Sequence, residues 1–256
     1  MSSIEVSLFE IVKKQVKFKL TSYQSIWISL VFTQLFGILL SSVVSQSGDS
    51  YSQTDIPPGI HSETVFTTIN TFDSTFLMVM TYIWIVASTI FLGVASTKRI
   101  DFGFISTRLS QFLSTIFTLI ILTAIGAITV YLGNSLISLI FVIFHEVMPV
   151  STHFTFLAHV ANVTGVFGYL LLYAAASYLA ISLYQLNRIV LPALLVLYGL
   201  TINLSATYQF NHPIGQLTRF FGEETSILIF VFKVVIFTAI LFGSTWLVTR
   251  NREVVS

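Results

Sequence analysis

Charged residues are scarce in this chain of 256 amino acids. Lys and Arg number 12 and Asp and Glu number 11, so 9% of the residues are charged, against about a quarter in a typical soluble domain. Hydrophobic residues make up 55%, and the mean hydropathy is +0.88. A soluble globule needs a polar surface, and a disordered chain needs low hydrophobicity. The composition excludes both classes and favours a protein with several membrane spans.

Several kinds of chemistry are missing as well. Cysteine is absent, which excludes a disulfide framework, an iron–sulfur cluster and a thiolate zinc site. A net charge of +1 argues against nucleic acid as a partner. The sequence contains no Gly-x-x-x-x-Gly-Lys-Ser/Thr phosphate loop, no His-Glu-x-x-His motif and no Gly-x-Ser-x-Gly nucleophile elbow. We therefore expect neither an enzyme nor a cofactor bound by this chain.

Six stretches are long and apolar enough for membrane helices, each of which needs about 20 such residues. They lie near 25–45, 75–97, 111–132, 157–183, 189–208 and 226–248. These spans predict an all-α domain over 25–248, after a lead-in region at 1–24 and before a short tail at 249–256. The polar segment 46–74 is expected to be a solvated loop. A seventh apolar stretch, 136–144, either extends the third span or forms a short interfacial helix.

The charges predict the orientation of these spans. With an even number of spans, both termini lie on one side of the membrane. That side holds ten basic residues: Lys13, Lys14, Lys17, Lys19, Lys98, Arg99, Arg108, Arg188, Arg250 and Arg252. The other side holds Arg219 with seven acidic residues: Asp49, Asp55, Glu63, Asp73, Glu146, Glu223 and Glu224. Because basic residues accumulate on the cytoplasmic side, both termini are predicted to be cytoplasmic.

The lead-in region has an amphipathic pattern. Leu8, Val12 and Val16 recur every four residues, and three lysines fall on other faces of a helix: Lys13, Lys14 and Lys17. A basic amphipathic helix before a span tends to lie along the anionic inner leaflet. The alternative is a disordered basic tail that only sets the topology.

The predicted cytoplasmic loop between the second and third spans mixes charged and aromatic residues. Its candidates for contact with a partner are Lys98, Arg99, Asp101, Phe102, Phe104 and Arg108. Exposed aromatic side chains beside basic ones are typical of a docking surface. Alternatively, these aromatic side chains lie in the headgroup region.

Four external residues are weak candidates for a metal site, and all fall within a short segment: His145, Glu146, His153 and His159. Imidazole and carboxylate groups bind zinc, and histidine titrates near pH 6.5. Their irregular spacing matches no known ligand pattern. Histidines at the membrane interface are therefore favoured over metal binding or pH sensing.

Lys233 is the one basic residue within a predicted span, roughly 10 Å from its external end at 1.5 Å per residue. Either it extends to the outer interface, or it pairs with Glu223, Glu224 or Glu146 or lines a substrate path. Acidic residues are absent from the predicted spans. Proton- or sodium-coupled carriers depend on such residues, so a channel or secondary carrier is disfavoured.

This layout resembles the membrane subunits of type-2 ATP-binding-cassette exporters. The shared features are the amphipathic helix over 4–20, the large external loop before the second span, and a cytoplasmic loop at 97–110 placed like a coupling helix. The external segment from Tyr208 to Thr225, with Pro213 and Gly215, corresponds to a region that is often re-entrant in that family. No short motif carries the resemblance, and the fused nucleotide-binding domain of larger members is absent.

The resemblance implies a permease in a bacterial plasma membrane. Two such subunits, identical or paralogous, face each other, and separate cytosolic ATPase subunits bind ATP and Mg²⁺ and dock against 98–109. Peptides, antibiotics or lipid-like molecules are the substrates that it implies. The alternative is a six-span protein that transports nothing, such as an immunity factor, a sensor or an assembly partner.

Overall fold

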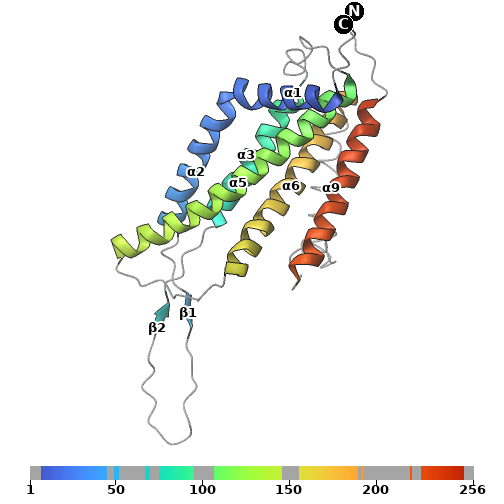
Figure 1. The fold of residues 1–256 in the computed structure, drawn as a ribbon. Coiled ribbons are helices and arrows are strands. Elements are labelled where there is room, and N and C mark those ends of the chain that lie inside the picture. Colours follow the sequence, from blue (N-terminus) through green and yellow to red (C-terminus); the bar gives the residue numbers. More distant parts are fainter. Residues whose placement is uncertain are drawn as a thin grey trace, which may run out of the picture.

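The computed structural model describes residues 7–44, 49–51, 67–69, 75–94, 107–145, 156–189, 192, 220 and 226–250. Its helices are α1 (Leu8–Ser22), α2 (Gln24–Val44), α3 (Thr75–Gly93), α5 (Arg108–His145), α6 (Phe156–Leu186) and α9 (Ile227–Arg250). Five of them form an elongated bundle, and α1 lies across one end of it (Figure 1). The predicted fifth span, 189–208, lies almost wholly outside the described residues.

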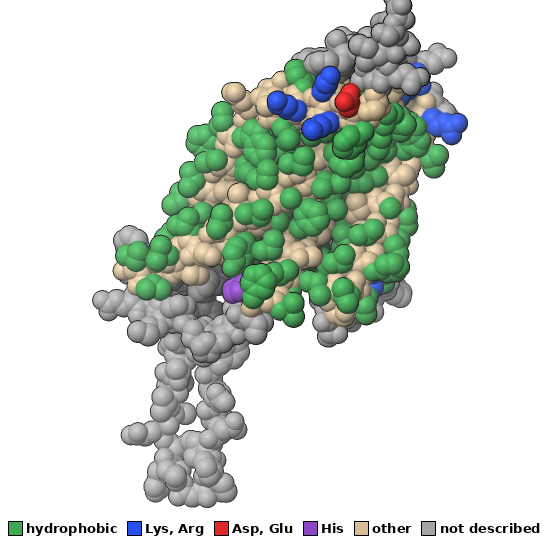
Figure 2. Space-filling model, in the orientation of Figure 1, with side chains coloured by type: hydrophobic (Ala, Val, Ile, Leu, Met, Phe, Trp, Pro, Cys, Tyr) green, Lys and Arg blue, Asp and Glu red, His purple; other side chains and the backbone are tan. Residues whose placement is uncertain are grey.

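The helices α2, α3, α5, α6 and α9 are long and apolar enough to cross a membrane, with mean hydropathies of 1.7 to 2.5. The bundle also exposes large apolar side chains such as Phe32 and Leu228. Hydrophobic side chains cover most of the face shown in Figure 2. The prediction of a helical, membrane-embedded protein is confirmed at this level.

Two short strands lie between α2 and α3, in the segment expected to be a solvated loop. β1 (Asp49–Tyr51) pairs with β2 (Thr67–Ile69) in an antiparallel arrangement, with Asp49 opposite Ile69. Tyr, Thr and Ile favour extended backbone. The polar composition of the whole loop did not indicate these two strands.

Helix α5 continues well past 132, the predicted end of the third span. It has 38 residues, or about 57 Å at 1.5 Å per residue, more than a straight crossing requires. The apolar stretch 136–144 is therefore the last part of this helix and not a separate one. Ile137 and Leu77 of α3 are both fully buried and share a cluster with Ile38 of α2, so packing stabilises the extension.

Aromatic contacts join α5, α6 and α9. Phe112 of α5 lies 5.1 Å from Trp246 of α9, and Tyr178 of α6 lies 6.4 Å from Phe242 of α9, measured between ring centroids. Tyr169 of α6 lies 5.3 Å from Phe230 at the start of α9. Residue numbers rise together along both helices, so α6 and α9 run parallel. The end of α6 and the start of α9 therefore lie at opposite ends of the bundle.

Side-chain hydrogen bonds stabilise both ends of α1. Ser7 caps its first turn by accepting a hydrogen bond from the Glu10 backbone N–H at 3.3 Å, which suits a serine N-cap. At its other end, Trp27 Nε1 donates to the Leu20 carbonyl at 2.9 Å, a group that lacks a partner within the helix. Trp84 Nε1 of α3 donates to the Ile26 carbonyl at 3.1 Å. The first turn of α2, directly after α1, is thus fixed to α3.

Candidate functional site

Basic side chains gather at the end of the bundle where α1 lies (Figure 2). Lys13, Lys14 and Lys17 are exposed on α1. Arg108, the first residue of α5, donates from Nη1 to the carbonyl of Arg250, the last residue of α9, at 3.0 Å. Residues distant in sequence therefore form one basic surface, which we call the basic end.

Lys19 is a basic residue of α1 that lies inside the protein, with 4% of its surface exposed. Its Nζ donates to Ser114 Oγ at 3.0 Å and to Thr115 Oγ1 at 2.9 Å, both on α5. These hydroxyls in turn donate to the Gln111 carbonyl at 2.8 and 2.9 Å. A buried ammonium group needs such partners, so Lys19 fastens α1 to α5.

Charge counting along the sequence identifies Lys19 only as a cytoplasmic charge. The spacing of the residues in this helix does indicate that Lys19 is buried. Val12, Val16 and Lys19 follow the i, i+4, i+7 pattern of one helix face. In the structure Val12 is buried, Val16 is half-buried and Leu8 is 44% exposed. The buried face of α1 is thus centred on Val12 and Lys19 and excludes Leu8.

The predicted docking loop joins two described helix ends. Gly93 ends α3 and Arg108 begins α5, and both lie at the basic end. Gln185, near the end of α6, donates from Nε2 to the Gly93 carbonyl, which fixes α3 against α6 there. Lys98, Arg99, Asp101, Phe102 and Phe104 lie outside the described residues.

A polar contact joins three helices within the bundle. Gln34 of α2 donates from Nε2 to Thr81 Oγ1 of α3 at 2.9 Å and to Thr129 Oγ1 of α5 at 3.2 Å. The two threonine hydroxyls donate to the carbonyls of Leu77 and Gly126 in their own helices. We call these three side chains the Gln34 cluster. They hold α2, α3 and α5 together.

The structure describes the side chain of one candidate metal ligand, His159. His159 of α6 contacts Tyr131 of α5, with 3.2 Å between Nδ1 and the phenolic oxygen. His145 ends α5, whereas Glu146 and His153 fall outside the described residues. Within the described ranges, no group of three His, Cys, Asp or Glu residues could hold a metal ion.

Lys233 contacts a backbone carbonyl and an aromatic ring. Its Nζ donates to the Phe220 carbonyl at 3.0 Å and lies 3.7 Å from the centroid of the Phe220 ring. The residue is half-buried. Its proposed acidic partners Glu223, Glu224 and Glu146 lie outside the described residues. No sequence pattern indicates the contact with Phe220, which lies 13 residues before Lys233.

Among known proteins, no family model, no curated protein and no solved structure matches this chain.

Proposed function

We propose that the chain is the permease subunit of an ATP-binding-cassette transporter whose ATPase is a separate cytosolic protein. The observation that carries this proposal is the attachment of α1. This helix lies across the basic end, where Trp27 fastens it to α2 and Lys19 fastens it to α5, while Trp84 joins the first turn of α2 to α3. Such a helix transmits movement from a partner at the basic end to the spans.

The directions of the helices support six spans with both termini on one side. Because α6 and α9 run parallel, the chain that joins them has to return from one end of the bundle to the other. One more crossing, as predicted at 189–208, meets that requirement. Since basic residues accumulate on the cytoplasmic side, we assign the basic end to the cytoplasm of a bacterial cell.

The docking site in this proposal is the loop 98–109 with the exposed face of α1. Its two attachment points, Gly93 and Arg108, belong to α3 and α5, and both helices share the Gln34 cluster with α2. A displacement of the loop would therefore reach three helices. The ATPase partner binds ATP and Mg²⁺, and a second permease subunit, identical or paralogous, completes the transporter. The substrate is a peptide, an antibiotic or a lipid-like molecule that moves outward.

Affinity purification in mild detergent tests this proposal. We expect an ATPase to co-purify with the wild-type chain, and the double substitution Phe102→Ala and Phe104→Ala to reduce its recovery or uncouple its activity. Phe32→Ala is the matched control, because Phe32 is 68% exposed on the apolar face of α2, away from the loop. Absence of any ATPase from intact wild-type complexes would favour the six-span protein that transports nothing.

A further inference from the structure

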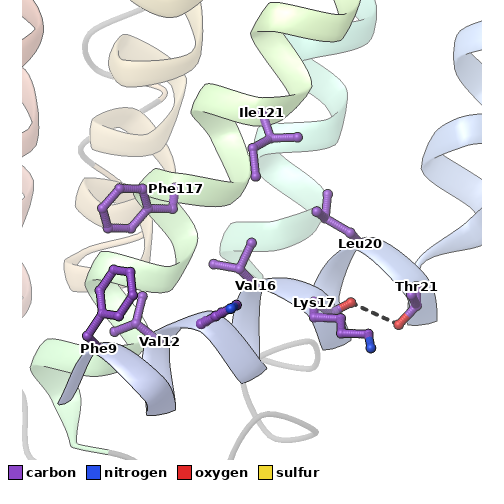
Figure 3. A pocket seen from close by; sticks show the side chains of 9 residues that line it. Phe9, Val12, Val16, Lys17, Leu20, Thr21, Phe117 and Ile121 are labelled. Carbon is purple, nitrogen blue, oxygen red and sulfur yellow. Dashed lines mark hydrogen bonds between the residues drawn. The ribbon is translucent and has the colours of Figure 1, made fainter. Parts of the chain in front are cut away.

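An apolar groove runs between α1 and the first half of α5, on the outside of the bundle (Figure 3). Its volume is about 460 Å³, within the usual range for a site that holds one small molecule or one acyl chain. Val16 and Leu20 point from α1 toward Phe117 and Ile121 of α5. The full lining is Phe9, Val12, Lys13, Val16, Lys17, Leu20, Thr21, Phe117 and Ile121.

Two lysines give this apolar groove a cationic rim. Lys13 and Lys17 line it and are exposed. Among the described residues, neither ammonium group has a hydrogen-bond or ion-pair partner. The Thr21 hydroxyl, also at the groove, is already engaged with the Lys17 carbonyl at 2.9 Å. The occupant that fits has an apolar chain and a negative charge at one end.

The groove lies where the charged headgroup of a membrane lipid meets its acyl chains. A basic amphipathic helix lies at the boundary between headgroups and acyl chains, and α5 runs from there along the apolar bundle. We propose that the groove binds one anionic glycerophospholipid of the leaflet at the basic end. One acyl chain lies along Val16, Phe117 and Ile121, and the phosphate and headgroup meet Lys13 and Lys17.

The two lysines decide which lipid binds. Within a bilayer, apolar contact with the protein gives an acyl chain little advantage over contact with other lipids. Each basic residue near the membrane surface favours anionic lipid. Two of them together correspond to roughly a 30-fold preference over a zwitterionic lipid with the same chains. The bound lipid joins α1 to α5 from outside, as Lys19 joins them from inside.

Lipid binding by the full chain in detergent tests this proposal. The protein is equilibrated with phosphatidylglycerol or phosphatidylcholine of identical chains, and bound lipid is counted by native mass spectrometry. Lys13→Gln with Lys17→Gln should reduce the preference to about twofold or less. Lys14→Gln is the matched control, because Lys14 is exposed on the same helix but does not line the groove. It should keep the preference.

A second pair of variants tests the acyl chain. Val16→Phe fills the groove and should reduce the binding of phosphatidylglycerol at least fivefold, whereas Ile128→Phe should not, because Ile128 is exposed on α5 beyond the groove. Ile121→Phe fills the groove from the opposite wall if Val16→Phe fails to fold. The proposal is overturned if Lys14→Gln acts like the double variant, if filling the groove leaves binding unchanged, or if inorganic phosphate at constant ionic strength displaces the lipid.

Discussion

Helices α1 and α9 are attached to the bundle in different ways. Polar contacts fasten α1, chiefly Lys19 with Ser114 and Thr115, and Trp27 with the Leu20 carbonyl. Close packing and aromatic contacts attach α9 along α6, where Phe230 lies against Gly168 and Phe242 against Tyr178. Among the five helices that are apolar enough to cross a membrane, α9 has the highest mean hydropathy, 2.5.

This difference follows from the solvent around each helix. Around α9 the solvent is hydrocarbon, where burying an apolar side chain gains little and small residues that permit close approach matter most. Around α1, which carries the exposed side chains of Lys13, Lys14 and Lys17, water competes for every polar group. A hydrogen bond of α1 therefore contributes to stability where it is shielded from water, as it is at Lys19. The two helices should therefore respond to different substitutions.

The largest effect is expected when Lys19 keeps its charge and loses its two hydroxyl partners. Ser114→Ala with Thr115→Val should lower the free energy of unfolding by about 3 kcal/mol, because hydrogen bonds to charged groups contribute about 1.5–3 kcal/mol each. Equilibrium unfolding in detergent measures this loss.

Lys19→Met provides the control for that experiment. Methionine fills similar space, and Ser114 and Thr115 keep their bonds to the Gln111 carbonyl, so we expect a loss of only about 1 kcal/mol. Adding Lys19→Met to the double variant should restore about 2 kcal/mol. If Lys19→Met alone is the more damaging change, then these two contacts are not what fastens α1.

The next largest effect tests the packing of α9. A Cβ atom at Gly168 would lie 2.8 Å from Cε1 of Phe230, closer than Cβ atoms approach other atoms, and 3.2 Å from Cγ2 of Val234, which is a tight contact. Gly168→Ala should cost about 2 kcal/mol, since overpacking a tight contact costs about 1–3 kcal/mol. Thermal unfolding in detergent is a suitable measurement.

Gly165, one turn earlier on α6, is the matched control. A Cβ there meets nothing within 4 Å, and alanine favours helix over glycine by nearly 1 kcal/mol. Gly165→Ala should therefore be neutral or stabilising. Equal losses at both positions would mean that α9 is not attached through this close contact.

A smaller effect is expected at the Gln34 cluster, which is a polar contact in the apolar part of the bundle. Gln34→Leu removes the bonds to Thr81 and Thr129 and should cost about 1 kcal/mol, since interhelical hydrogen bonds in membranes average about 0.6 and reach about 1.7 kcal/mol. Thr33→Val is the control, because Thr33 bonds to carbonyls of its own helix. A loss above about 3 kcal/mol would show that polar contacts dominate here as they do at α1.

The membrane-spanning helices could be predicted from the sequence, because the length of an apolar stretch decides whether such a helix forms. The positions of α2, α3, α6 and α9 follow the apolar stretches closely. The length of α5 could not be decided, since the stretch 136–144 is compatible with two arrangements. Packing of Ile137 against Leu77, a contact between distant segments, determines the outcome.

The candidate site could be predicted less well. Charge counting places basic residues at one end, but it does not distinguish Lys19, which is buried, from Lys17, which is exposed two residues earlier. That distinction depends on which face of α1 meets α5. The same holds for the groove, since its two walls come from segments about a hundred residues apart in the chain.

The smallest effect is expected at Lys233, the counterpart of Lys19 on α9. Its contacts are the Phe220 carbonyl and the face of the Phe220 ring, and a cation over an aromatic ring contributes about 0.5–1 kcal/mol where water has access. A double-mutant cycle of Lys233→Met and Phe220→Leu should therefore give a coupling energy of about 0.7 kcal/mol. Each single change should cost less than about 1 kcal/mol, because Lys233→Met also removes a charge from an apolar helix. A coupling energy near zero would mean that the ring of Phe220 does not hold Lys233, which would leave only the bond to the backbone carbonyl. A coupling energy as large as the loss at Ser114 and Thr115 would contradict the contrast between the two helices.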